Sequence, residues 1–284
     1  MTHKKKLFFL SFLLLIGVIF SGCAKIDQAK VKLGLKNNDF EYIKQGKIQK
    51  IVIQNTRDPG FRFVVSDKKA ISDLYDILSG AKEVKAKTSL EPDYVFEMQE
   101  GPNKVYKFNY VTGLGKSDGG NFYSDGKIYQ VSKQLDSDII SSLWTIRKPK
   151  EFQKIYYGMI LDEVEKYSKG DGKGKSIGIN IYDDTDVAKF VFSQDLENLK
   201  YDLKDKAPNA EIKQVIKDKN TKEKEYDIDM NIKTQGYKTF LYKAEITFYN
   251  RKDKTEKKHY IKVSDDEKIG NWQTQVFDKK PDGF

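Results

Sequence analysis

Few residues in this chain of 284 could carry out covalent or metal chemistry. Cys23 is the only cysteine, and His3 and His259 are the only histidines. This scarcity excludes disulfides within the chain, cysteine–histidine nucleophiles and metal sites built from several histidines. His259 lies beside Tyr260 in a predicted strand, without an identifiable serine or aspartate partner. We therefore interpret it as a surface or half-buried strand residue rather than a general base.

Two short runs of acidic residues offer the oxygen ligands that hard cations prefer. They lie at residues 183–186 (Asp183, Asp184 and Asp186) and at residues 265–267 (Asp265, Asp266 and Glu267). The first run lacks the downstream glycine and bidentate glutamate of an EF-hand loop. Because acidic residues in turns commonly face water or cap helices, we predict no metal site. A carboxylate pair for hydrolysis stays open among the 42 acidic residues, without a recognisable motif.

Two glycine-rich stretches, residues 170–176 and 113–120, are candidates for phosphate binding. The first ends in Gly-Lys-Ser, but Lys169 occupies the position of the first P-loop glycine. Its predicted context, a helix before and a strand after, also reverses the required order. The second stretch has Asp118 where a dinucleotide fingerprint needs its third glycine. We predict that both are loops, and that the second can line a binding surface.

The first 22 residues have the order of a secretory signal. Residues 4–6 are lysines, residues 7–20 are apolar, and Ser21 and Gly22 are small. We predict a signal peptide over residues 1–22, with an uncleaved membrane anchor as the alternative. The small residues before Cys23 resemble the lipobox of bacterial lipoproteins. This resemblance implies that a diacylglycerol with fatty acids such as palmitate is attached to the Cys23 sulfur, and that the mature protein is anchored to the outer face of the cell membrane.

The charge of the chain bears on its partners. Removing the three leader lysines lowers the formal charge from +9 to +6, spread among 42 acidic residues. Such a surface is weakly attracted to anionic lipid headgroups or wall polymers. No basic stripe interleaved with aromatic residues occurs in the sequence, so we predict no nucleic-acid partner.

Local patterns predict the elements that position these residues. Residues 23–47 are polar and charge-mixed, and we predict a lipid-anchored tether there. A first domain is predicted over residues 48–146, with a helix between a cap at Ser66 or Asp67 and Gly80. A tight hairpin is predicted at Asp125-Gly126. The strand patterns lie at residues 48–53, 61–65, 94–98 and 106–110, and the closing helix has Leu135, Ile139, Ile140 and Leu143 on one face. The aromatic run of the strands is predicted to fill the core, with an exposed aromatic platform as the alternative: Tyr94, Phe96, Tyr106, Phe108, Tyr110, Phe122, Tyr123 and Tyr129.

A second domain is predicted over residues 149–284, beginning with a helix at Pro149. A strand at 177–181 and a helix at 196–203 follow. The remaining segments alternate as strands, at residues 212–215, 226–232, 240–248, 259–263 and 272–277. The predicted fold class is α+β, with two domains that each consist of a mainly antiparallel sheet packed with helices.

Residues 89–94 (SLEPDY) and 121–129 (NFYSDGKIY) look like the YhfM-like domain of uncharacterised lipoproteins. The resemblance implies a domain over residues 48–146 and brings no activity or site. The second domain is similar in element order to cystatin-like or NTF2-like folds, which host both binders and enzymes.

The sequence therefore predicts a two-domain lipoprotein of a Gram-positive-type cell envelope that acts by binding rather than catalysis, without a cofactor. Its expected partners are membrane lipid through Cys23 and an envelope protein or wall component. A small-ligand carrier with a pocket in the C-terminal domain is the alternative, and a carboxylate-dependent hydrolase is a weaker one.

Overall fold

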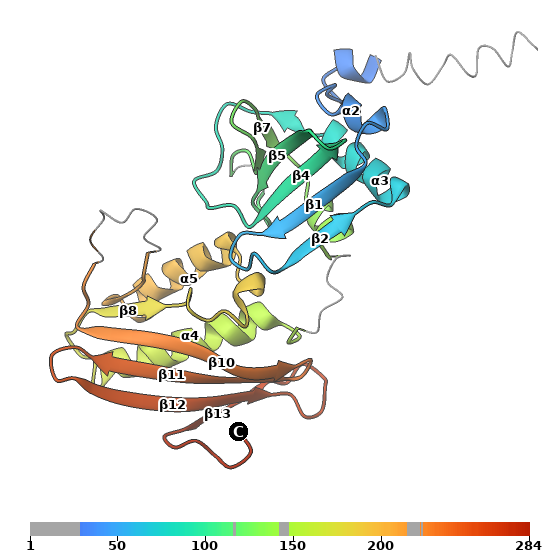
Figure 1. Cartoon of the computed structure of the whole chain (residues 1–284). Coiled ribbons are helices and arrows are strands. Elements are labelled where there is room, and N and C mark those ends of the chain that lie inside the picture. The colour runs from blue at the N-terminus through green and yellow to red at the C-terminus, as the bar shows by residue number, and fades with distance from the viewer. Residues whose placement is uncertain (1–28, 116–117, 142–147, 215–221, 223) are drawn as a thin grey trace, which may run out of the picture.

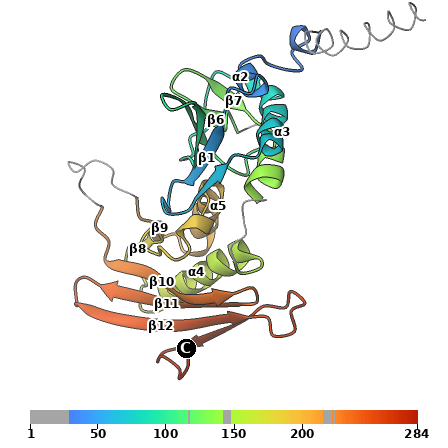
Figure 2. The same cartoon turned by 45° about the vertical axis from the view of Figure 1, so that its right-hand side comes forward.

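The computed structural model describes residues 29–284 apart from residues 116–117, 142–147, 215–221 and 223. Two sheets with their helices form two domains, one above the other in Figures 1 and 2. This arrangement confirms the predicted two-domain α+β class. The predicted signal peptide and Cys23 lie outside the described residues. Within the described part of the chain, no helix combines the length and the apolar character needed to cross a membrane.

The first domain has an antiparallel sheet with the strand order β2-β1-β4-β5-β6-β7-β3. Helix α3 and a π-helical turn, η1, contribute buried residues to the same core as the sheet. The elements are α2 (Glu41–Lys44), β1 (Lys50–Asn55), β2 (Arg62–Val65), α3 (Lys68–Ser79), β3 (Lys82–Glu83), β4 (Tyr94–Glu100), β5 (Lys104–Tyr110), β6 (Phe122–Tyr123), β7 (Ile128–Gln130) and η1 (Leu135–Ile140).

Local signals in the sequence explain these elements well. The Asp67 carboxylate accepts the backbone N–H of Ala70 at 2.9 Å, which caps α3 as predicted. The Asp125-Gly126 turn joins β6 to β7, also as predicted. The closing helix is a short π-helix with Leu135 buried; Leu143, predicted to extend it, lies outside the described residues.

The predicted tether is wrong at its C-terminal end. Phe40 and Ile43 are 1% and 3% exposed and belong to the first core. The Asn37 side chain donates to the carbonyls of Leu78 and Ala81, both at 2.9 Å. The segment looked like a linker because its two core residues stand among charged ones. Residues 37–47 are therefore part of the first domain.

The second domain has the strand order β13-β12-β11-β10-β8-β9. Helices α4 and α5 lie on the side of this sheet that faces the first domain (Figures 1 and 2). The elements are α4 (Phe152–Lys169), β8 (Ile177–Asn180), the 3-10 helix η3 (Ala188–Phe190), α5 (Ser193–Lys206), β9 (Ala210–Ile212), β10 (Ile228–Lys238), β11 (Leu241–Asn250), β12 (Thr255–Ser264) and β13 (Gln273–Phe277).

One part of the second sheet is parallel. β8 pairs in parallel with both β9 and β10, whereas β10 to β13 form an antiparallel meander. The parallel pairing follows from α5, which returns the chain so that β9 runs beside β8 in the same direction. The alternating pattern of the later strands predicts the antiparallel meander, but it does not predict that β8 and β9 pair in parallel at its edge.

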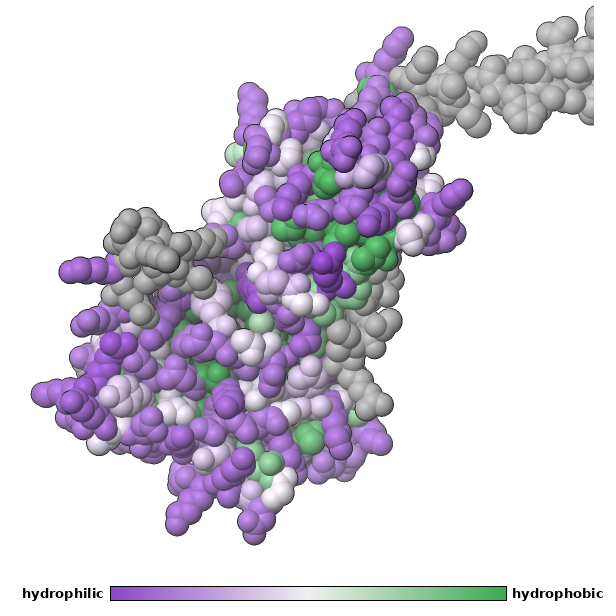
Figure 3. Space-filling view, viewed as in Figure 1, coloured by the Kyte–Doolittle hydropathy of each residue, from purple (hydrophilic) through white to green (hydrophobic). Residues whose placement is uncertain are grey.

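The surface of one face of the molecule is mostly hydrophilic (Figure 3). The larger hydrophobic areas in this view lie over the first domain.

Candidate functional site

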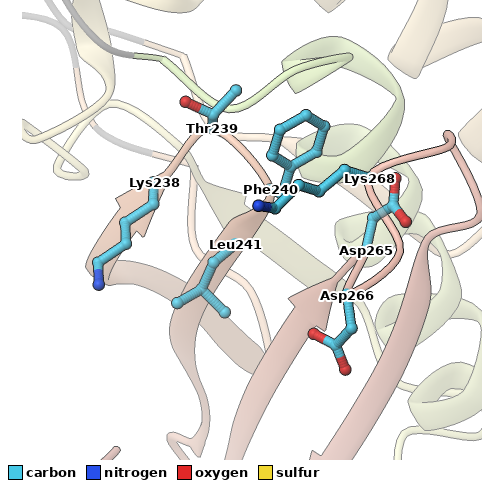
Figure 4. A pocket seen from close by; sticks show the side chains of 7 residues that line it. All are labelled: Lys238, Thr239, Phe240, Leu241, Asp265, Asp266 and Lys268. Atoms are coloured by element: carbon cyan, nitrogen blue, oxygen red, sulfur yellow. The ribbon is translucent and has the colours of Figure 1, made fainter.

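A shallow pocket lies at the end of the second sheet, where the turn between β10 and β11 meets the loop after β12 (Figure 4). It encloses about 400 Å³. We call it the hairpin pocket, and its lining residues are Lys238, Thr239, Phe240, Leu241, Asp265, Asp266 and Lys268.

Backbone hydrogen bonds on both sides hold the β10–β11 turn in place. The Phe240 carbonyl accepts the N–H of Asp265 at 3.1 Å, and the Thr239 carbonyl accepts the N–H of Lys150 at 2.8 Å. Lys238 and Leu241 are paired across the hairpin, so Thr239 and Phe240 form its tip. The turn therefore presents a phenylalanine at a place where chains commonly carry small polar residues.

An aromatic pair borders the hairpin pocket. The rings of Phe240 and Trp272 are stacked with centroids 6.3 Å apart and planes at 26°. The Lys150 ammonium lies 5.8 Å from the Phe240 centroid, within range of a cation–π contact. The Trp272 indole N–H donates to the Glu151 carboxylate at 3.4 Å. Half-exposed rings with polar neighbours can contact the apolar face of a ligand while the polar groups bind its polar atoms.

Asp265 is the buried acid of the pocket, only 2% exposed. One carboxylate oxygen, Oδ2, accepts the N–H of Gly270 at 2.6 Å. The other, Oδ1, has no hydrogen-bond partner among the described residues. An unsatisfied buried acceptor costs about 1–3 kcal/mol. A donor group brought by a ligand would recover part of that cost.

The backbone around the pocket is strained. Glu151 and Lys268 have φ values of 57° and 60°, and Gly270 has 90°. A left-handed conformation costs a residue with a side chain on the order of 1 kcal/mol, and such residues gather at binding sites. Strain, an aromatic pair and an unpaired buried carboxylate oxygen therefore meet at this one place.

A second polar cluster joins the two domains, and we call it the joint. Asp93 on the first domain is fully buried, at 0% exposed. Its Oδ1 accepts from the Arg57 guanidinium at 2.6 Å and from the backbone N–H of Ser193 at 2.8 Å. Its Oδ2 accepts the N–H of Thr112 at 2.9 Å. Ser193 is the first residue of α5, so a carboxylate of one domain caps a helix of the other.

Further contacts of the joint hold the domains together. The Ser193 hydroxyl donates to the Glu91 carbonyl at 2.7 Å and accepts from the Arg57 guanidinium at 2.5 Å. The Phe192 ring packs against the first core, 6.3 Å from the ring of Tyr94. Because these bonds occupy both oxygens of Asp93, this acid is structural.

Asp195 lies beside the joint and has a perturbed pKa. Burial and the nearby charge of Asp93 raise the pKa of Asp195 to about 6, against the opposing effects of Gln153, Lys148 and Arg57. Its Oδ2 has no hydrogen-bond partner among the described residues. Burial also raises the pKa of Tyr157 above its ordinary value, with the charge of Asp195 as the next cause. The pKa of this acid beside the joint thus lies in the mildly acidic range.

In the acidic run at residues 183–186, Asp184 is engaged in hydrogen bonds within the second domain. Asp184 is buried and accepts from the Thr234 N–H at 2.9 Å, the Thr234 hydroxyl at 2.8 Å and the Tyr156 hydroxyl at 3.2 Å. Burial raises the pKa of Asp184, while these hydrogen bonds oppose the rise. Among the described residues, no group of three or more potential ligands could hold a metal ion. Asp184 therefore ties α4 to β10.

His259 has a partner that sequence reasoning missed. It is 5% exposed, and its Nδ1 lies 2.5 Å from Oε2 of the equally buried Glu163 on α4. The two residues are 96 positions apart, so no local pattern could show the pair. The imidazole ring also packs edge-on against Phe248, at 5.8 Å. The prediction that His259 lies in a strand is confirmed, and the prediction that it lies at the surface or half-buried is wrong.

The glycine-rich stretches are loops, as predicted. The 170–176 stretch follows α4, and its carbonyls at Gly172 and Lys175 accept from the Asn209 side chain at 3.3 Å and 2.6 Å. In the 113–120 stretch, Gly113 donates its N–H to Asp136 at 2.9 Å. Residues 116 and 117 lie outside the described part.

The aromatic run of the first domain fills the core, as predicted. Phe108 and Phe122 are stacked 4.7 Å apart, and Phe96 meets Phe122 edge-on at 5.5 Å. The half-exposed Tyr106 instead stacks on Tyr42 at 4.0 Å. A pocket in the C-terminal domain was predicted only as the alternative, and its place at the β10–β11 turn was not predicted. Its signals in the sequence are Phe240 at the tip of a hairpin and the acidic run that contains Asp265 and Asp266.

Residues 44–149 match a family model described as YhfM protein. The matched range contains every strand of the first sheet, so the N-terminal domain is YhfM-like. No curated protein and no solved structure matched the chain.

Proposed function

We propose that this protein is an exported lipoprotein, anchored through Cys23 to the outer face of a Gram-positive-type membrane, that acts as a binding or accessory module of the cell envelope. The observation that carries the proposal is the order of residues 1–23: three lysines, an apolar run, two small residues and the only cysteine. A diacylglycerol supplies two acyl chains, which suffice for stable anchoring.

Two features of the described residues support a binding role. The joint fixes the second domain to the first through the buried Asp93 carboxylate. The hairpin pocket presents the aromatic pair and ionic side chains that recognise ligands without a reacting nucleophile. A module of this kind holds a partner at a set place relative to its anchor.

The anchor is tested by labelling cells with radioactive palmitate. We expect label in the wild-type protein and in the control Ser11→Ala, which alters the apolar run mildly, and none in Cys23→Ala. Label that persists in Cys23→Ala, or its absence from the wild type, would contradict the anchor.

The accessory role is tested by crosslinking in intact cells, followed by purification and mass spectrometry. We expect one envelope protein to be enriched with the anchored wild type and lost with secreted Cys23→Ala. If no partner recurs between replicates, the accessory-module proposal fails.

The second candidate function is a small-ligand carrier, which the position of the hairpin pocket in the C-terminal domain favours. The pocket opens at the end of the sheet rather than inside the domain, where the core cluster packs between the sheet and helices α4 and α5. Its lysines and carboxylates are complementary to the charged ends of a peptidoglycan fragment, and its aromatic rings can stack on the sugar rings.

A soluble disaccharide-peptide from peptidoglycan is the probe for this candidate. Titration calorimetry is expected to show binding to the wild type and at least about a tenfold loss of affinity in Phe240→Ala, because this ring lines the pocket. Tyr201→Ala, an exposed aromatic on α5, is the control and should bind like the wild type. Equal affinity of Phe240→Ala would exclude this pocket.

A further inference from the structure

Two leucines near the start of the described chain face solvent. Leu33 and Leu35 are 73% and 64% exposed. The backbone here is ordered by a helical turn, in which Leu33 donates to Ala29 at 3.0 Å and Leu35 donates to Lys30 at 2.8 Å. Gly34 between them has a φ of 68°, a conformation suited to glycine that ends the turn. Together with Lys30 and Lys32, these two leucines form what we call the leucine patch.

The leucine patch is fixed to the first domain. Asn37, two residues after Leu35, donates its backbone N–H to the Ser79 carbonyl at 2.7 Å. Its side chain makes the two hydrogen bonds to the end of α3 described above. The leucines are therefore held outward by the fold instead of lying on a free tail.

The patch has a basic rim. Residues 29–47 contain five lysines against two acids, Asp39 and Glu41. Both acids have partners: Asp39 pairs with Lys127, and Glu41 accepts from the Tyr75 hydroxyl at 2.8 Å. Lys30 and Lys32 are exposed. Exposed apolar side chains with adjacent lysines are complementary to an anionic bilayer surface, where the chains insert and the ammonium groups meet phosphates.

We propose that the leucine patch rests on the anionic surface of the membrane and orients the protein upon it. The inference rests on the proposed anchor at Cys23, ten residues before Leu33. A chain of ten residues spans at most about 35 Å, and a flexible one about 17 Å. The anchor thus keeps the leucine patch close to the bilayer, so that even a weak contact is enough to orient the protein.

The orientation has a consequence for the pocket. In Figures 1 and 2, the start of the described chain lies at the end of the first domain that is farther from the second domain. Contact at the leucine patch therefore points the second domain, with its hairpin pocket, away from the membrane and toward the wall.

The test uses the mature chain carrying Cys23→Ala, so that no lipid is attached. Its binding to vesicles of phosphatidylglycerol and phosphatidylcholine is measured by sedimentation. We expect weak binding, reduced at least about fivefold in the double variant Leu33→Ser/Leu35→Ser. In a second variant, Lys30→Gln/Lys32→Gln, the affinity for the vesicles should fall by a similar factor for each lysine removed. The binding of this variant should also depend much less on salt concentration. Tyr201→Ser, which removes an equally exposed apolar group from the second domain, is the control and should bind as the wild type does.

Three results would overturn the proposal. The first is no binding of the wild-type sequence to anionic vesicles, and the second is unchanged binding of the leucine variant. The third is binding to a soluble polyanion that depends on the lysines but not on the leucines, which would assign the patch to a wall polymer. Failure here leaves the anchor intact, since palmitate labelling tests Cys23 separately. Circular dichroism of each variant confirms that the fold is retained.

Discussion

The Asp93 carboxylate of the first domain caps α5 of the second by accepting the N–H of Ser193 at 2.8 Å. The same oxygen accepts from Arg57, whose side chain also reaches the Ser193 hydroxyl. A helix whose own N-cap, Phe192, offers no side-chain acceptor thus obtains one from the neighbouring domain. The stability of α5 and the attachment of the domains are therefore coupled.

Replacing Asp93 should weaken both helix α5 and the attachment of the two domains. In Asp93→Ala, Arg57 loses its buried partner and α5 loses its cap, so the free energy of unfolding should fall by about 3 kcal/mol or more. Urea denaturation followed by circular dichroism measures the change. The matched control is Asp73→Ala, whose ion pair with Lys69 is exposed and should contribute at most about 1 kcal/mol. Equal losses in the two variants would contradict the role of the joint.

Asp195 should make stability depend on pH. Its pKa is about 6 in the folded chain, above the ordinary value of 3.8, so the folded state binds the proton more tightly. The stabilisation is complete below about pH 4 and is lost as the pH rises through about 6. Compared with Asp195→Asn, the wild type should lose about 1–2 kcal/mol over this range, after allowance for solvent screening. Parallel stability curves of the two proteins from pH 4 to pH 7 would refute this.

Two glycines should respond in opposite directions to alanine. A Cβ at Gly178 on β8 would lie 2.4 Å from the Tyr226 ring, so Gly178→Ala should destabilise by about 1–3 kcal/mol. A Cβ at Gly158 on α4 would meet nothing within 4 Å. Gly158→Ala should therefore stabilise by about 0.5–1 kcal/mol through helix propensity. Melting temperatures of the two variants should change with opposite signs. A stabilised Gly178→Ala would contradict the packing at Gly178, and a destabilised Gly158→Ala would contradict the open space at Gly158.

The buried pair of His259 and Glu163 should be costly to break. His259→Ala leaves a cavity and an unsatisfied carboxylate, so we expect a loss of about 2–4 kcal/mol in urea denaturation. Glu163→Gln keeps the side-chain shape and a hydrogen-bonding group, and should lose less. A loss in Glu163→Gln as large as in His259→Ala would show that shape and hydrogen bonding do not explain the pair.

The sequence predicts best what neighbouring residues determine. Asp67 before a helical pattern and Asp125-Gly126 between strand patterns are local signals, and the structure confirms both. The alternation of Ile228, Met230 and Ile232 likewise marks β10. In each case the physical cause, a cap, a turn or a buried face, acts within a few residues.

What the sequence could not predict depends on distant contacts. Ser193 and Asp93 are 100 residues apart, and each alone looks like an ordinary loop residue. Asp184 stands in an acidic turn typical of the surface, yet it is buried because Thr234 and Tyr156 supply its donors. The hairpin pocket brings Phe240 and Asp265 together, and Trp272 stacks on Phe240 beside it; the meander of strands places these distant residues next to one another.

The strand order of the second sheet determines when this domain can fold. Ile177 of β8 is paired with Ala210 on one side and with Ile228 on the other, and both partners come later in the chain. While the chain emerges N-terminus first, Ile177 has no strand partner until Ala210 of β9 follows 33 residues later, and its second partner, Ile228 of β10, follows 51 residues later. Such non-local pairing is slow, because the loop must close before any contact rewards it. The first domain, whose described elements end at Ile140, can fold meanwhile, and its Asp93 is then already in place to receive α5.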